Sequence, residues 1–295
     1  MKIKNIVIFL NGNRGVAVLD YLLTQNLKIS AVITSEASEF SHMSHKYKDL
    51  NVVVKSNVND SESIEKLRSY ESDVFIVAGF SSILKKELLK VPKLGVINLH
   101  GGPLPKYRGG SPLNWQIIND EKTIGVSLIF MNEGLDTGDV IAEGSFELEE
   151  SDDIFSVHQK ANKLFVELIS KSFKEIEDSV LTVRTQFEGA AQYWVQRTPE
   201  ESLIKWWELT ARQVFNKIRA LKPPYPSAFT FYNGTKVFLY DSLVPKTIVR
   251  GTPGRVVHIQ GTGPYVICKD RAIIINDASI KLSGGICGYV PYVEE

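Results

Sequence analysis

The amino-acid sequence predicts an α/β protein in which a doubly wound, mostly parallel sheet is followed by a smaller β-barrel domain. In the first half of the 295-residue chain, short β-rich runs alternate with helical patterns, as they do in doubly wound sheets. After about residue 190 the sequence changes to short strands separated by turn signals, which is typical of a barrel of five or six strands. We therefore expect two domains, over residues 1–195 and 196–295.

The strands expected in the first domain are short apolar runs bounded by polar residues and glycine. They cover Asn5 to Leu10, Ile29 to Thr34, Val52 to Val54, Asp73 to Ala78, Gly95 to Leu99, Val126 to Phe130 and Val140 to Phe146. Helical patterns lie between them at Ala17 to Thr24, Ser61 to Ser69 and Ile83 to Leu89. A longer amphipathic helix follows, with Ser151-Asp152 at its start and apolar residues at helical spacing from Ile154 to Leu168.

The second domain is expected to begin with a helix from Pro199 to Leu221, in which Trp207 and Ile218 belong to one apolar stripe. A β-hairpin follows, because Asn233-Gly234 separates two β-rich runs and Asn-Gly accepts positive φ at both turn positions. The two runs are Ala228 to Tyr232 and Lys236 to Tyr240.

Charge and cysteine content argue against several classes of protein. Lys+Arg and Asp+Glu both number 34, so the net charge gives no attraction to nucleic acid or a membrane, although residues from 196 onward carry 13 basic and 8 acidic side chains. Cys268 and Cys287 lack metal-ligand spacing, which predicts a reduced cytoplasmic protein without disulfides or a metal. The apolar run after Met1 has five residues, too few for a signal peptide or a membrane-spanning helix.

Polar side chains gather at the carboxyl end of the strand expected from Gly95 to Leu99. Asn98 and His100 are two residues apart, so they lie on the same face of that strand, at the sheet edge where open α/β sheets bind ligands. Asp136 follows 36 residues after His100, in a loop at the end of another strand, and could complete the set. Asp139 is the rival carboxylate, for which we expect a structural role.

Three motifs around these residues resemble the formyltransferases that use 10-formyltetrahydrofolate. They are Asn98-Leu-His100, Leu104-Pro-Lys-Tyr-Arg-Gly109 and Gly134-Leu-Asp-Thr-Gly-Asp139, in this order and spacing. The stretches Ile218 to Leu221 and Pro224 to Phe229 resemble the linker helix and barrel entry of the methionyl-tRNA formyltransferase group, so the resemblance covers nearly the whole chain. It implies a Rossmann-like formyltransferase domain followed by an OB-like barrel.

The resemblance implies that Asn98, His100 and Asp136 are the catalytic residues. Formyl transfer to an amine needs stabilisation of a tetrahedral oxyanion, which the Asn98 amide can donate to. It also needs a proton route, which an imidazole that titrates near neutrality can supply. Asp136 would orient the imidazole and raise its basicity.

The resemblance also implies the sites of both substrates. Formyltetrahydrofolate, the co-substrate, would meet the backbone of the loop Gly79-Phe80-Ser81-Ser82-Ile83-Leu84 on one side and of Gly134-Leu135 on the other. The plain alternative for the first loop is a turn in which Ser81 or Ser82 caps the following helix. Tyr107, Arg108 and Gly109 would contact the acceptor, with Arg108 presented to a phosphate or a sugar, or else exposed as a surface charge.

Three functions remain open. The resemblance is closest to nucleotide-sugar N-formyltransferases such as the UDP-aminoarabinose formyltransferase, on the stretches Ser111 to Trp115 and Pro224 to Pro226. Methionyl-tRNA formylation would need a sizeable basic surface, whereas residues 35–51 carry only two lysines against three acidic residues. A non-catalytic folate- or nucleotide-binding module is the third. A nicotinamide cofactor is rejected, because Asn11 to Gly15 lacks the Gly-x-Gly-x-x-Gly spacing of dinucleotide-binding loops. A homodimer is compatible with the sequence.

Overall fold

The computed structural model describes residues 2–38, 40, 44–223, 225–259 and 261–288, and the chain divides into two compact units. The first unit consists of Met1–Pro112, Thr123–Phe146 and His158–Trp194. The second consists of Leu113–Lys122, Glu147–Val157 and Val195–Glu295. Two short segments that precede residue 195 thus belong to the second unit.

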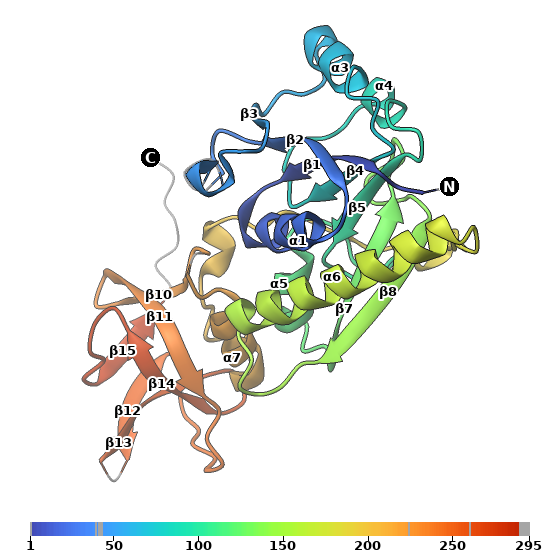
Figure 1. Cartoon of the computed structure of the whole chain (residues 1–295). Helices are drawn as coiled ribbons and strands as arrows, with labels where there is room; N and C mark the ends of the chain where they lie inside the picture. The colour runs from blue at the N-terminus through green and yellow to red at the C-terminus, as the bar shows by residue number, and fades with distance from the viewer. Residues whose placement is uncertain (1, 39, 41–43, 224, 260, 289–295) are drawn as a thin grey trace. The chain divides into compact units, whose positions relative to one another are not determined.

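A seven-stranded sheet forms the centre of the first unit (Figure 1), in the order β3-β2-β1-β4-β5-β7-β8. The strands are β1 (Asn5–Leu10), β2 (Lys28–Thr34), β3 (Val52–Val54), β4 (Val74–Ala78), β5 (Val96–His100), β7 (Thr123–Phe130) and β8 (Val140–Glu147). The pairs among β1 to β5 are parallel, and β5 pairs with β7 antiparallel. The predicted doubly wound, mostly parallel sheet is therefore confirmed.

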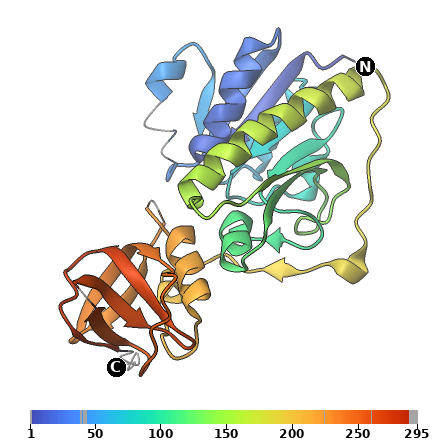
Figure 2. The same ribbon diagram turned by 90° about the horizontal axis from the view of Figure 1, so that it is seen from below.

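Helices cover both faces of this sheet. On one face α1 (Gly12–Thr24) lies beside α6 (Ile154–Glu177), as Figure 2 shows. The Arg14 guanidinium of α1 is 5.0 Å from the centre of the Phe165 ring of α6. On the other face α3 (Ser61–Arg68) and α4 (Lys86–Leu89) contribute Leu67 and Leu88 to a core with alternate residues of the strands. Every residue of β4 is buried, which explains its continuous apolar sequence.

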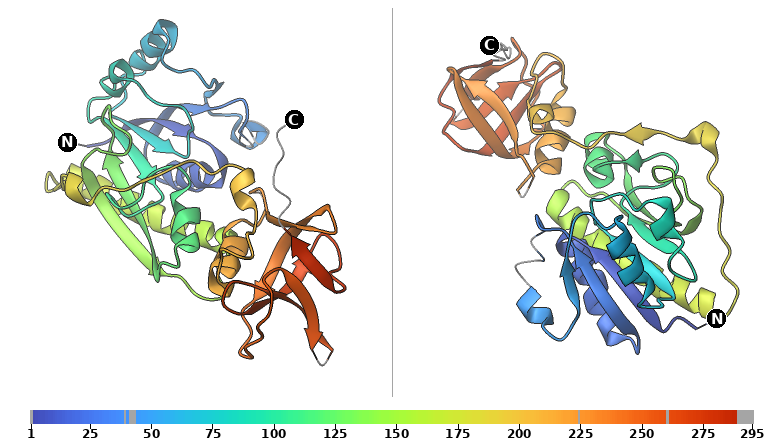
Figure 3. Two further views of the ribbon diagram at one scale, coloured as in Figure 1. Left: turned by 180° about the vertical axis from the view of Figure 1, so that it is seen from behind. Right: turned by 90° about the horizontal axis from the view of Figure 1, so that it is seen from above.

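A closed barrel forms most of the second unit, coloured orange to red in Figure 3. Its strands are β10 (Ala228–Tyr232), β11 (Thr235–Leu243), β12 (Arg255–Ile259), β13 (Thr262–Ile267), β14 (Ala272–Ala278) and β15 (Gly285–Gly288). The predicted hairpin turn is present, with positive φ at both Asn233 and Gly234. Asn114 of α5 (Pro112–Ile118) belongs to the same unit and donates to the carbonyl oxygen of Ala220, 2.8 Å away.

Two predicted helices are shorter in the structure. The helix expected from Ile83 begins at Lys86, and its N-cap is Lys85, so neither Ser81 nor Ser82 caps it. In place of the helix from Pro199 to Leu221, the chain forms a 3-10 turn, η3 (Glu200–Ser202), and the helix α7 (Ala211–Ala220).

Local hydrogen bonding explains the late start of α7. Thr210 and Gln213 form a capping box, which ends the preceding loop at Thr210. Trp207 therefore precedes the helix and is 48% exposed, whereas Trp206 is fully buried and donates to the Thr230 hydroxyl. The placement of Trp207 on a buried stripe was wrong.

Among the described residues, no helix combines the length and apolar character needed to cross a membrane. Cys268 and Cys287 are free, buried thiols, and burial raises the pKa of both. Pro224, which is part of the Pro-Tyr-Pro motif, lies outside the described residues.

Candidate active site

The structure brings the predicted histidine and aspartate together at the carboxyl end of β5. Asn98 and His100 lie two residues apart on β5, on the face of the sheet that carries α3 and α4. The Nδ1 atom of His100 is 3.5 Å from the Asp136 carboxylate, and both side chains are nearly buried. Asn98 is half-buried beside them.

The second ring nitrogen of His100 faces a backbone acceptor. Nε2 lies 2.5 Å from the carbonyl oxygen of Tyr107. A carbonyl oxygen can only accept, so this contact requires the ring proton to be on Nε2. A neutral ring with that proton leaves Nδ1 able to take up a second one beside the Asp136 carboxylate.

Burial lowers the pKa of His100 below its ordinary value, and Asp136, which acts in the opposite direction, does not outweigh the burial. Asp136 raises the basicity of the imidazole as expected, but the expectation that the ring titrates near neutrality was wrong, because the ring is shielded from water on nearly every side and burial outweighs the carboxylate. The neutral form that prevails near pH 7 is the form that can accept a proton. Asp136 is then placed to stabilise the imidazolium that results.

The loop that carries Asp136 is held by hydrogen bonds to its backbone. Asp136 has a positive φ of 53°, and its carboxylate accepts a hydrogen bond from the Gly109 amide at 2.9 Å. Asn132 accepts from the Gly134 amide and from the Thr137 hydroxyl, which shapes the turn before Asp136. Asn132 was not identified from the sequence.

The loops predicted to meet formyltetrahydrofolate lie close together. Lys86, just after the first loop, forms an ion pair of 2.8 Å with Glu133, just before Gly134. Ile83 and Leu135 are 76% and 59% exposed, so each loop presents one large apolar side chain to solvent. Gly79, Ser81 and Ser82 also reach the surface. In contrast, Phe80 and Leu84 belong to the buried core, so only their backbone could meet a ligand.

Tyr107 and Arg108, which were expected to be presented to the acceptor, are buried. Arg108 is fully buried, and its guanidinium binds Glu188 through both carboxylate oxygens, at 2.6 and 2.9 Å. The expected exposed charge was therefore wrong, because the chain supplies an acidic partner 80 residues away. Gly109 has a φ of 97° and lies against Trp194.

A segment that the sequence analysis did not single out covers this loop. We call residues 186–194 the strap. Its strand β9 (Tyr193–Trp194) pairs with β6 (Arg108–Gly109), and the ring of Trp194 stacks on Tyr107 with centroids 5.4 Å apart. No local pattern marks the strap, since its contacts are to residues 48 to 88 positions earlier in the chain.

Comparison with known families settles the membership of this chain. The family described as Formyl transferase matches residues 4–172, and the family described as Formyl transferase, C-terminal domain, matches residues 197–285. The chain belongs to the formyltransferase family. The resemblance inferred from the three motifs is confirmed.

Curated relatives of this formyltransferase include enzymes of different names. The methionyl-tRNA formyltransferase of Caldanaerobacter subterraneus is 36% identical over 199 residues, which cover 68% of this chain and 64% of that protein. The bifunctional polymyxin resistance protein ArnA of Wigglesworthia glossinidia brevipalpis is 32% identical over 283 residues, which cover 92% of this chain and 42% of that protein. The chain thus matches less than two thirds of the length of either relative.

Solved structures share the fold of this formyltransferase. WlaRD, a sugar 3N-formyl transferase solved with dTDP and 5-N-formyl-THF, has a TM-score of 0.71 at 20% identity and covers 96% of this chain and 100% of its own. The N-formyltransferase of Helicobacter canadensis, solved with folinic acid and dTDP-3-aminofucose, has a TM-score of 0.70 at 21% identity and covers 92% of this chain and 98% of its own.

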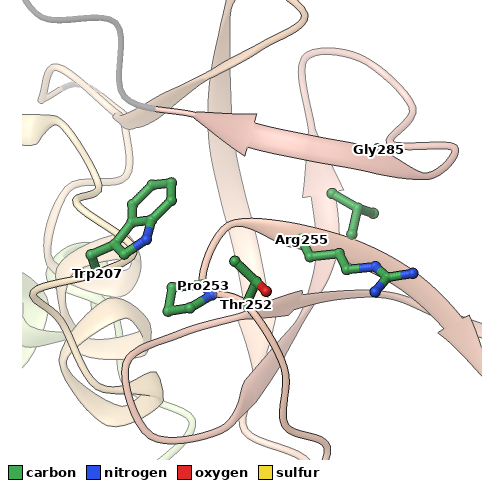
Figure 4. A pocket seen from close by; sticks show the side chains of 6 residues that line it. Trp207, Thr252, Pro253, Arg255 and Gly285 are labelled. Atoms are coloured by element: carbon green, nitrogen blue, oxygen red, sulfur yellow. The ribbon is translucent and has the colours of Figure 1, made fainter.

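The barrel unit of this formyltransferase has a pocket of its own, of about 440 Å³ (Figure 4). It is lined by Trp207, Thr252, Pro253, Arg255, Val256 and Gly285. None of the catalytic or substrate-binding residues predicted from the sequence is among the described residues that line it. No group of three or more metal-ligating side chains occurs in the part of the chain that the structure describes.

Proposed function

We propose that the chain transfers a formyl group from 10-formyltetrahydrofolate to the amine of a nucleotide-linked amino sugar. The observation that carries the transferase proposal is the juxtaposition of His100 and Asp136, 3.5 Å apart, with Asn98 on the same face of β5. An amide donor, a proton acceptor and a carboxylate then serve one reaction centre. No metal is needed for this chemistry.

The reaction forms a bond between the acceptor nitrogen and the formyl carbon, and then breaks the bond from that carbon to N10 of the folate. The Asn98 amide donates to the oxygen of the tetrahedral intermediate, a contact that strengthens as negative charge develops there. Neutral His100 takes the proton from the attacking amine. The proton is returned to the leaving nitrogen, and Asp136 stabilises the imidazolium in between.

The two adjacent loops support the donor assignment. Ile83 and Leu135 expose apolar surface on the two sides of one site, and the Lys86–Glu133 ion pair holds the loops together. A flat pterin ring fits between apolar side chains, while the backbone of Gly79 and Gly134 supplies polar groups for its edge.

Three observations support the sugar as acceptor. The match to ArnA extends over 283 residues, whereas matches to methionyl-tRNA formyltransferases extend over 199 to 236. Two structures with this fold are named for sugar or dTDP-aminosugar substrates. Of the two lysines in residues 35–51, Lys46 is paired with Asp20 at 3.3 Å, so this segment offers little free positive charge to a nucleic acid.

The second candidate is the formylation of methionyl-tRNA. It is favoured by the 36% identity to an enzyme of that name and by the excess of basic residues after residue 196. The two acceptors differ in the response to salt, because a tRNA complex loses about a thousandfold or more in affinity between 50 and 200 mM salt.

The assignment is tested by incubating the protein with 10-formyltetrahydrofolate and one of two kinds of acceptor. The acceptors are UDP- and dTDP-linked amino sugars and charged initiator methionyl-tRNA. The controls are the same nucleotides linked to sugars without an amine. We expect tetrahydrofolate release only with an aminosugar, with kcat/KM changing less than about tenfold between 50 and 200 mM salt. Turnover restricted to the tRNA would transfer the assignment to the second candidate, and folate binding without turnover on any acceptor would indicate a non-catalytic module.

A further inference from the structure

A buried glutamine of the strap binds the loop that carries Asp136. The amide nitrogen of Gln186 donates to the backbone carbonyl oxygens of Asp136 at 2.8 Å and of Gly138 at 2.7 Å. Both donors of the amide are therefore used on one loop. Gln186 is nearly buried, so water does not replace these bonds freely.

The carbonyl end of the same side chain is bound by Arg108. The Nε atom of Arg108 donates to Oε1 of Gln186 at 3.0 Å, which fixes the orientation of the amide. The two Nη atoms of the guanidinium donate to the Glu188 carboxylate, and one of them also donates to the Tyr193 hydroxyl; both residues belong to the strap. Burial of Arg108 strengthens these charge-assisted bonds.

The backbone beside Arg108 contacts the two proposed catalytic side chains directly. The carbonyl oxygen of Tyr107 faces Nε2 of His100, and the amide of Gly109 donates to the Asp136 carboxylate. The side chain of Arg108 and its neighbouring peptide groups thus connect the strap to both members of the pair. Gln186 closes this connection through the backbone of Asp136.

We propose that Gln186 is a positioning residue, which holds the Asp136 loop so that the carboxylate stays next to His100. The inference rests on the catalytic role proposed above for Asp136. Asp136 has a left-handed backbone conformation, which is less favourable for an L-residue than the right-handed one and is stabilised by contacts around the loop. Two hydrogen bonds from Gln186, to the carbonyls on either side of Thr137, provide such contacts.

Two variants separate the contacts of Gln186. Gln186→Met has a similar length and can neither donate nor accept through an amide. Gln186→Glu keeps an acceptor for Arg108 but places an oxygen against the carbonyls of Asp136 and Gly138. If the donors matter, both variants lower kcat about tenfold to a hundredfold, because small displacements of a catalytic group are costly. KM for 10-formyltetrahydrofolate should change less than about threefold.

The pH profile gives a readout that a merely structural role would not change. His100 is faced by Asp136, by the Tyr107 carbonyl and by Arg14 from α1. Displacing Asp136 weakens the effect of the carboxylate that raises the pKa of His100, so the acidic limb of kcat should move to lower pH in Gln186→Met. Gln186→Glu brings a carboxylate of its own near the ring, so it is judged on kcat alone. Phe187→Ser, at an exposed neighbouring position of the strap, is the matched control and should leave kcat and the profile unchanged.

Asp136→Asn is measured in parallel to separate the two proposals. A nearly inactive Asp136→Asn, together with wild-type kcat in both Gln186 variants and an unshifted profile in Gln186→Met, would overturn the positioning role alone. A fully active Asp136→Asn would overturn the proposed function, and the positioning role with it. Circular dichroism confirms that each variant is folded before its rate is used. If Gln186→Met is not folded, the kcat of Gln186→Glu, which retains an acceptor for Arg108, tests the positioning role.

Discussion

His100 is the residue on which the proposed chemistry depends, and burial decides its protonation state. The ring is almost inaccessible to water and lies beside Asp136, yet its pKa is lowered because desolvation outweighs the carboxylate. A catalytic histidine that remains neutral near pH 7 can accept the proton of an amine. The residue types were predictable from the sequence, but the net direction of the pKa was not, since it depends on burial.

We expect His100→Ala and Asn98→Ala each to lower kcat at least about a hundredfold, because each removes a group that acts on the reacting atoms. Steady-state kinetics with 10-formyltetrahydrofolate and the aminosugar measure the effect. His258→Ala, at an exposed position of the barrel, is the control. Wild-type rates in either active-site variant would contradict the catalytic assignment.

A second test concerns His158 on α6 and measures the stability of the protein. Burial, together with Arg14, lowers the pKa of His158 from 6.5 to about 4. Its folded-state pKa lies below the unfolded value, so its contribution is complete above pH 6.5 and is lost as the pH falls toward 4.

We therefore expect the free energy of unfolding to fall by about 2 to 3 kcal/mol more in the wild type than in His158→Gln over this range. Urea denaturation of both proteins at several pH values measures the difference. Parallel pH dependences would show that His158 does not titrate differently in the folded chain.

Among the elements, the short pair β6–β9 joins the strap to the loop beside the site. Gly109 has a φ of 97°, and a Cβ atom there would lie 2.3 Å from the carbonyl oxygen of Trp194. Only glycine allows this approach, in which the amide of Gly110 donates to the same oxygen at 2.8 Å. The glycine in the Tyr-Arg-Gly motif thus has a structural reason in the strap.

We expect Gly109→Ala to destabilise the protein by about 2 kcal/mol or more and to lower kcat, because the added methyl group separates β6 from β9. Gly234→Ala is the matched control. It has a similar positive φ of 77° but nothing within 4 Å of the added atom. Equal losses of stability and activity in the two variants would mean that backbone strain alone, and not strap docking, is responsible.

Element boundaries were the least predictable part of the fold. The strands from Asn5 and from Ala228 were located within a residue, because their apolar runs end at turn residues. The helix expected from Pro199 was wrong over its first half, since the apolar pattern continues through residues that form a loop and only the capping box at Thr210 sets the true start.

Across the whole molecule, the fold class was predictable and the completion of the site was not. Alternating strands and helices specify a doubly wound sheet from local sequence, and the two-residue period places Asn98 and His100 on one face. Gln186, Glu188 and Trp194 could not be found in this way, since their partners lie 48 to 88 residues earlier in the chain. The burial of Arg108 was missed for the same reason.

The strap also ends where the chain passes for the last time from the first unit into the second. A chimaera that receives its barrel from a relative would therefore have to be joined after Trp194. A junction placed before Gln186 would replace the strap as well as the barrel. A loss of rate in such a hybrid could then come from the new strap, and it would give no information about what the barrel recognises.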